Sequence, residues 1–397
     1  MEKKDYGKNL KVKRESNVEI CRIVCMLMII AHHCVVHGGG IYMELCKNKY
    51  IAWLIFPGGK LCFDAFLAIS AWFLVDQTFR TERFLKTWTT VFFYSVVFAF
   101  ASVAMGTVLT WRNWFSILFP ITGNSHGFAA SYLAFYLLIP FLSIISNKIS
   151  QKQAKWIVIL LLYYQVISKI IGAVSGYYQP LYSEVTLFVL CYFIAFYLKR
   201  YPIKLMKNKI FLLGILLLIW GSVFLIYIGA NIYYPGNQWI AFLLSLCGDE
   251  SSILFLFGGF AMFFLFKNIK MPNSSLINKI AHTTFGVLLI HDHNFFRGCV
   301  WNNIFHATEW WYSKYYYIYI GICVVIIFVF GMFVDLMRQY FIEKPLFSMK
   351  WIKKFSARCD EILNIGMDEQ RNETLNIIMD ERCNEILDIS MDEKKIG

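Results

Sequence analysis

The sequence predicts an all-α membrane protein, a polytopic bundle of about ten transmembrane helices with both termini in the cytoplasm. Three observations lead to this fold class. Of 397 residues, 58% are hydrophobic and only 16% are charged, whereas about a quarter of the residues in a soluble protein are charged. The apolar residues gather in runs near the roughly 20 residues that a helix needs to cross a bilayer. Lys and Arg cluster in alternate segments between those runs, as they do in cytoplasmic loops.

Ten segments are long and apolar enough to be interpreted as spanning helices, in which every backbone group finds its partner internally. They cover residues 18–37, 60–77, 84–106, 129–147, 155–173, 184–199, 209–230, 249–267, 281–298 and 316–338. The segments 60–77 and 281–298 are the most polar of the ten. Their polar residues include Lys60, Asp64, His291, Asp292, His293 and Arg297. No alternating pattern typical of a membrane β-barrel occurs.

The loops support this count, because an error of one span would disturb the alternation of charge. Residues 1–17 carry six basic side chains, whereas residues 174–183 and 231–248 carry no Lys or Arg. The basic loops that follow every second span contain Arg80, Arg83, Lys86, Lys148, Lys152, Lys155, Lys199, Arg200, Lys204, Lys207, Lys209, Lys267, Lys270, Lys279, Arg338, Lys344, Lys350, Lys353 and Lys354. Both termini are therefore expected in the cytoplasm.

Charge and cysteine usage exclude two other classes of protein. The net charge of +12 comes from clusters between apolar runs rather than from one exposed face, so it does not predict nucleic-acid binding. Several of the 11 Cys lie in or beside apolar runs without paired spacing, which argues against a secreted disulfide scaffold. The first apolar run ends in His32, His33 and Cys34 rather than a small-residue cleavage site, so we interpret it as a retained span.

The chain divides into three parts. Residues 1–17 form a basic cytoplasmic N-terminus, residues 18–347 the transmembrane domain, and residues 348–397 a cytoplasmic tail. In the tail, Met-Asp-Glu recurs at 367–369, 379–381 and 391–393. Such an acidic repeat with few apolar residues does not predict a packed solenoid, and it is either a solvated appendage or a segment that binds a partner.

The first span carries a polar stripe. At about 100° per residue, Glu19, Arg22, His33 and His37 fall on one face of the helix, and His32 falls on another. Eleven residues separate Arg22 from His33, about 16 Å along the axis. This spacing places Arg22 near the cytoplasmic surface and His33 past the middle of the membrane.

Ionisable groups inside a membrane are costly and point to function. Arg22 could instead extend to the interface, and His33 could be a neutral imidazole bonded to a neighbouring helix. The functional alternative for His33 is proton transfer, which suits an imidazole. His33 and His37 could also share a metal ion, but no Glu or Asp in the same segment completes a zinc set, so we predict no metal site.

Five pieces of the chain resemble the membrane acyltransferase family called acyltransferase 3. Arg22, ten residues and then His33 match the family's first helix, with Glu19 at the acidic position. The segments 59–70 and 131–142 resemble later helices of the family, the segment 284–292 resembles its Phe-Gly-x-Tyr-Leu-x-His block, and Ile342-Glu343-Lys344-Pro345 resembles its Glu-x-Pro signature. The best likeness is to the branch that modifies bacterial surface polysaccharides. Ala71 and Leu288 depart from the usual Gly and Tyr.

This resemblance implies a multi-pass enzyme of the bacterial plasma membrane. It would move an acetyl or similar short acyl group from acyl-coenzyme A, a co-substrate rather than a permanently bound cofactor, to a hydroxyl of a surface polysaccharide or its lipid-linked precursor. The implied catalytic residues are His33, Glu19 and His291. Arg22, Arg80 and Arg83 would bind the phosphates of coenzyme A, whose charges suit guanidinium groups.

Two questions stay open at the level of sequence. His33 could act as a general base in direct transfer, or it could accept the acyl group itself, since His can be a covalent nucleophile. The competing class of function is a transporter or flippase of polysaccharides or small molecules, which would predict internal repeats in two halves of the chain. The membrane part contains no such repeat.

Overall fold

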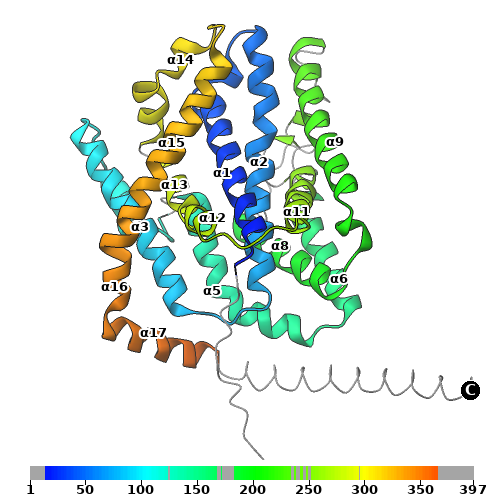
Figure 1. The fold of residues 1–397 in the computed structure, drawn as a ribbon, viewed down its shortest axis with the longest axis vertical. Helices are drawn as coiled ribbons and strands as arrows, with labels where there is room; N and C mark the ends of the chain where they lie inside the picture. The colour runs from blue at the N-terminus through cyan, green and yellow to red at the C-terminus, as the bar shows by residue number, and fades with distance from the viewer. Residues whose placement is uncertain are drawn as a thin grey trace, which may run out of the picture. The chain divides into compact units, whose positions relative to one another are not determined.

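The structure, a computed structural model, describes residues 14–123, 126–167, 171, 183–233, 237, 242–244, 247–248, 252–294 and 296–364 (Figure 1). Helix accounts for 82% of it, and the described ranges contain no strand. The predicted all-α class is therefore confirmed. The acidic repeats at 367–393 lie outside the described residues.

Within the described residues, six helices are long and apolar enough to cross a membrane. They are α1 (Ser16–His37), α2 (Lys47–Leu74), α3 (Thr81–Ala104), α5 (Gly127–Lys148), α9 (Lys209–Ile228) with the π-turn that follows it, and α15 (Tyr316–Arg338) with its continuation to Ser348. Each overlaps one predicted span. The total of ten spans and the cytoplasmic location of the termini stay predictions.

The four other predicted spans correspond to shorter helices. Residues 155–173 include most of α6 (Gln151–Leu162), and part of that range lies outside the described residues. Residues 184–199 form α8 (Glu184–Arg200), and residues 249–267 contain α11 (Ile253–Lys267). Both α8 and α11 are shorter than the roughly 20 residues of an untilted span.

Two predicted boundaries were wrong. Helix α2 begins at Lys47 rather than near residue 60 and continues through Pro57, because the turn-forming pair Gly58-Gly59 is accommodated inside the helix. Residues 281–298 are not one helix: α12 (Ser275–Ala281) and α13 (Thr284–His291) come first, and a π-turn follows at Cys299–Ile304. Helix α13 ends where the apolar run meets Asp292 and His293.

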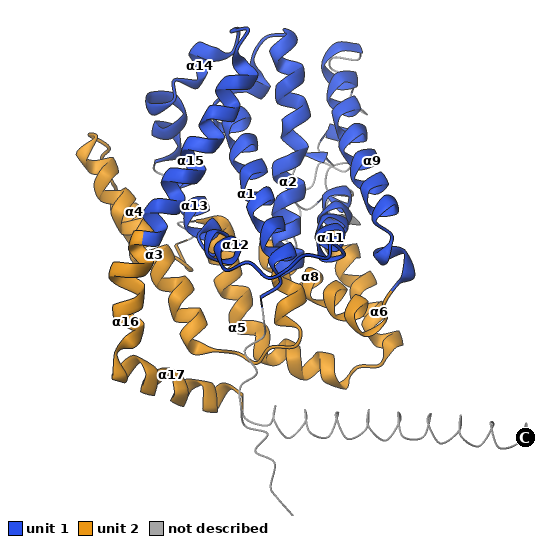
Figure 2. Ribbon diagram, in the orientation of Figure 1, with its two compact units in different colours: residues 1–69, 203–336 blue, residues 70–202, 337–397 orange. Residues whose placement is uncertain are grey.

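The chain forms two compact units, each described separately (Figure 2). The first contains residues 1–69 and 203–336, and the second contains residues 70–202 and 337–397. In the first unit, α1 contacts α11, α12 and α13, and α9 packs along α11. Helix α1 therefore contacts segments that lie more than 200 residues later in the chain.

Helices α2 and α11 of the first unit approach closely at Gly259. A Cβ at this position would lie 2.5 Å from the backbone carbonyl carbon of Asp64. Only a residue without a side chain permits this approach, which is the usual way that membrane helices gain packing contacts. The position of α11 against α2 therefore depends on the absence of a Cβ at Gly259.

The second unit is built around α3, α5 and α8. It also contains α4 (Trp111–Leu118), α6, α16 (Lys344–Ser348) and α17 (Lys350–Leu363). Helix α5 packs on α8, where the hydroxyls of Ser146 and Tyr192 lie 3.3 Å apart. Helix α17 contacts α3, and Asp360 of α17 accepts a hydrogen bond from the backbone N–H of Thr81.

The Glu-x-Pro segment does not end a helix. A π-turn at Gln339–Glu343 leads directly into α16, with Pro345 near its first position, where proline is tolerated because the N–H is not needed. Arg338 donates a hydrogen bond of 2.8 Å to the carboxylate of Glu343, and both side chains are largely buried. Glu343 therefore has a structural role as the partner of Arg338.

The close approach at Gly259 generates a stability prediction. Gly259→Ala should lower the free energy of unfolding by about 1–3 kcal/mol, the usual range for an overpacked site. Gly214→Ala in α9 is the matched control, since a Cβ there meets nothing within 4 Å and alanine favours a helix by up to about 1 kcal/mol over glycine. Thermal denaturation of the two purified variants in detergent measures the difference. Equal midpoints would contradict the packing described for α2 and α11.

Candidate active site

Helix α1 carries the polar stripe that the sequence predicts. Glu19, Arg22, His33 and His37 are all partly exposed, with 13%, 26%, 14% and 24% of their side chains accessible. Met26, Ile30 and Val35 of the same helix are buried in the core of the first unit. Met26 and Ile30 lie between Arg22 and His33 on the same side of the helix. The polar residues therefore form two partly exposed groups, Glu19 with Arg22 and His33 with His37, separated by a buried apolar stretch.

Arg22 and Glu19 lie together at the N-terminal part of this face. The Nε of Arg22 is 3.6 Å from the Oε2 of Glu19, one helical turn away. This i, i+3 pair orients the guanidinium without neutralising all of its donors. Glu19 is thus a neighbour of Arg22, and it is separated from His33 by 14 positions along the helix.

His32 has a structural role, consistent with its predicted place off the polar face. It is buried, and its Nδ1 donates to the backbone carbonyl of Phe56 at 2.6 Å. A Cβ at Gly59 would lie 2.2 Å from Cγ of His32, so Gly59 makes room for the ring. The histidine therefore fastens α1 to α2.

His33 meets His291, as the candidate residues of α1 and α13 come together. The Nδ1 of His33 lies 3.0 Å from the Nε2 of His291, and their ring centroids are 5.1 Å apart. His291 is buried, and its own Nδ1 lies 2.7 Å from the backbone carbonyl of Val287. Two predicted catalytic residues thus form one hydrogen-bonded chain.

The direction of this chain follows from its end. A carbonyl oxygen only accepts, so Nδ1 of His291 carries a proton and, in the neutral ring, its Nε2 is an acceptor. His33 must then donate from Nδ1, which leaves the lone pair of neutral His33 on Nε2. The backbone carbonyl of Val287 therefore selects the tautomer of His33 through His291.

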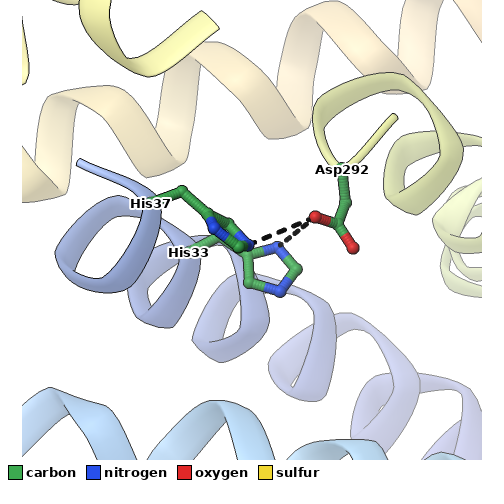
Figure 3. Close-up of side chains that lie close together, drawn as sticks. All are labelled: His33, His37 and Asp292. Atoms are coloured by element: carbon green, nitrogen blue, oxygen red, sulfur yellow. Dashed lines mark ion pairs between the residues drawn. The ribbon is translucent and has the colours of Figure 1, made fainter. Parts of the chain in front are cut away.

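Asp292 brings a carboxylate to the same place from the end of α13. Its Oδ1 lies 3.3 Å from Nε2 of His37 and 3.9 Å from Nδ1 of His33 (Figure 3). Arg297 reaches the same oxygen with its Nη1 at 3.6 Å. The contacts of the Asp292 carboxylate are therefore with His33, His37 and Arg297.

Packing against α15 fixes α13 in this position. A Cβ at Gly286 would lie 2.2 Å from Cγ of Asp335, a buried residue of α15. Glycine thus allows the two helices to approach until the Asp335 side chain fills the space. This contact sets where His291 and Asp292 stand relative to α15.

His33, His37 and Asp292 each offer a ligand atom, and these atoms lie within 4.8 Å of one another. The expectation of no metal site rested on the lack, in the first span, of a Glu or Asp that could complete a zinc set with His33 and His37. Asp292 comes from a segment more than 250 residues away, so no spacing rule within α1 could reveal it. The donor set of two imidazoles and one carboxylate is suited to a zinc-type ion.

Arg80 and Arg83 belong to the second unit. Both side chains are exposed, Arg83 donates to the side chain of Gln77, and the backbone of Arg80 contacts the Tyr136 hydroxyl. Their association with Arg22 at one binding site stays a prediction.

One family model matches most of the chain. The family model described as "Acyltransferase domain", that of acyltransferase 3, matches residues 15–334. The chain belongs to the acyltransferase 3 family. The match contains α1, α13 and all the residues of the His33 cluster. No curated protein and no solved structure matched the chain.

Membership of the acyltransferase 3 family and the six apolar helices together indicate a membrane acyltransferase. The family assignment favours this class over a transporter. Two glycines in the segments that resemble the family make close helix contacts in the structure: Gly59 accommodates the ring of His32, and Gly286 accommodates Asp335.

If His291 sets the tautomer of His33, its acceptor atom matters more than its ring. We expect His291→Leu to lower the rate of acyl transfer by on the order of 10²-fold, because the donor of His33 loses its partner and the tautomer is no longer fixed. His291→Gln keeps an acceptor and should recover much of that loss. Initial rates in membranes with matched protein levels and matched melting temperatures measure the effect. Equal rates for the two variants would leave His291 with a packing role only.

Proposed function

We propose that the protein transfers an acetyl or similar short acyl group from acyl-coenzyme A to a hydroxyl of a cell-surface polysaccharide or its lipid-linked precursor. The observation that carries this proposal is the hydrogen-bonded chain from Val287 through His291 to His33. It leaves a lone pair on Nε2 of His33, a residue that is partly exposed on the polar face of a membrane helix.

A sugar hydroxyl needs such a group, because it is a poor nucleophile at neutral pH. In our proposal, Nε2 of His33 takes the hydroxyl proton as the oxygen attacks the thioester carbonyl. The C–S bond then breaks, and the thiolate of coenzyme A leaves and receives a proton. A positioned base contributes roughly 10²–10⁴-fold. The Asp292 carboxylate, 3.9 Å from the ring, would stabilise the imidazolium that forms.

Arg22 is the proposed contact for the phosphates of coenzyme A. It lies eleven residues before His33, about 16 Å along the helix, and the pantetheine arm of coenzyme A likewise separates the phosphates from the thioester. Glu19, beside Arg22, would position the guanidinium. Arg80 and Arg83 are proposed as further phosphate contacts because both are exposed cations that follow the second helix in the chain.

This assignment needs Arg22 on the side from which the donor arrives. With both termini in the cytoplasm of a bacterial cell, the donor would approach the N-terminal part of α1 and the acceptor would meet His33 nearer the outer side. The basic loops support this orientation. No resident cofactor is proposed, and nucleic acid is not a proposed partner.

The proposal admits two routes at the same atom. In the direct route, Nε2 only accepts a proton. In the relay, Nε2 attacks the thioester carbon and Nδ1 gives its proton to His291, while the C–S bond breaks and the leaving thiolate takes a proton from water. The hydroxyl then attacks the acyl-imidazole and releases its proton to water; the C–N bond breaks, and His291 returns its proton to Nδ1. A labelled acyl group trapped on His33 in the absence of acceptor would favour the relay, and its absence in a single turnover would favour direct transfer.

The deciding experiment compares acyl transfer in membranes that contain the wild type, His33→Ala or Arg22→Ala. Labelled acetyl-coenzyme A is supplied, and base-labile label on the polysaccharide is counted. We expect His33→Ala to lower kcat by roughly 10²–10⁴-fold and Arg22→Ala to raise KM for the donor. His306→Ala, at an exposed histidine whose side chain pairs with Glu309, is the matched control. Undiminished transfer by His33→Ala at a normal protein level would refute the proposed base.

A further inference from the structure

The cluster of His33, His37 and Asp292 has donors beyond those that the proposed transfer uses. His37 contacts Asp292 at 3.3 Å, and its ring lies 4.9 Å from that of His33. The three residues come from two segments of the same unit and point toward one another (Figure 3). His37 has no part in the proton chain from Val287 to His33.

The distances fit a small divalent ion. With bonds of about 2.0–2.2 Å to nitrogen and oxygen, two ligands of a tetrahedral zinc ion lie roughly 3.3–3.5 Å apart. The His37–Asp292 distance is 3.3 Å and the His33–Asp292 distance is 3.9 Å. All three ligand atoms lie within 4.8 Å of one another. Side-chain rotations that bring the most distant pair roughly 1.3–1.5 Å closer would complete the set.

The surroundings permit an ion to enter and to be held. Between 14% and 29% of each of the three side chains is accessible, so the donors are not sealed in the core. Asp292 supplies one negative charge to the ion. The positive charge of Arg297, 3.6 Å from the same carboxylate oxygen, opposes the binding of a cation. Its side chain is 41% accessible and can move away, or it can pair with the second oxygen of Asp292.

We propose that His33, His37 and Asp292 form a binding site for a zinc-type divalent ion, and that the bound ion blocks the base function of His33. A ligating nitrogen must present its lone pair. Without an ion, the Nδ1 of His33 that faces Asp292 carries a proton, and this N–H donates a hydrogen bond to His291. Ligation through Nδ1 moves that proton to Nε2, with no net change in protonation, and Nε2 can then no longer accept a proton from the substrate.

Two parts of this inference are separable. Binding of the ion depends only on the three donors. Inhibition of transfer rests on the proposed function, because it requires His33 Nε2 to be the base. The tests below therefore measure the ion and the transfer independently.

The binding test uses the full chain, purified in detergent, stripped with a chelator and titrated with Zn²⁺ or with Co²⁺ as a spectroscopic probe. We expect one ion per chain in the wild type and a tetrahedral Co²⁺ absorption. His37→Gln and Asp292→Asn should each weaken binding by at least tenfold, and His306→Gln, at an exposed histidine outside the cluster, should bind as the wild type does. Wild-type binding no stronger than that of His37→Gln would overturn the site.

The transfer test adds Zn²⁺ to the same proteins in membranes and expresses each rate relative to that variant's own metal-free rate. We expect Zn²⁺ to inhibit the wild type and His306→Gln and to have at least a tenfold weaker effect on His37→Gln. If Zn²⁺ instead raised the rate of transfer, the proposal that a bound ion prevents His33 from acting as the base would be wrong. If the metal-free wild type transfers no acyl group but still binds one added ion, the proposed function is refuted and the ion site is retained.

Discussion

The hydrogen bond between His33 and His291 is the interaction on which the chemistry of this protein depends. An imidazole alone in a membrane has two interchangeable nitrogens and no fixed orientation. Here a backbone carbonyl, which can only accept, fixes the proton of His291, and His291 in turn fixes the proton of His33. The chain of donors therefore defines one atom, Nε2 of His33, as the basic one. This is the same logic by which a second hydrogen bond sets the tautomer of histidine in other sites.

The fold holds this bond by close packing rather than by many polar contacts. Helix α1 is fastened to α2 by His32 over Gly59, and α13 is fastened to α15 by Asp335 over Gly286. Each contact needs a glycine, because even a Cβ atom at that position would overlap the facing side chain. His33 and His291 are thus carried by two helices whose positions are set elsewhere, and interior packing leaves little freedom for either to drift.

Sequence reasoning found the fold class, the polar stripe of α1 and both histidines, because each is a property of a single segment: composition, helical periodicity or a local motif. It failed where distant segments decide the outcome. The segment 281–298 looked like one span, but its helix ends at His291, and Asp292, the next residue, faces His33 of α1. The start of α2 was missed because Lys47–Pro57 is less apolar than the rest and gains its helix from burial of Trp53 and Phe56. No signal in α1 pointed to a carboxylate beside His33 and His37.

The cost of placing ionisable groups in an apolar bundle explains why they are gathered. A charged group at the middle of a membrane helix costs about 2.5–3.5 kcal/mol on insertion scales, and separate sites would each carry that cost in full. Asp292 lies against two imidazoles and a guanidinium, so its charge is partly offset wherever the protons happen to be. The same grouping that makes a carboxylate tolerable inside the bundle also brings three ligand atoms together. A site able to stabilise a proton on His33 during transfer is, for that reason, also a site able to stabilise a metal cation in its place.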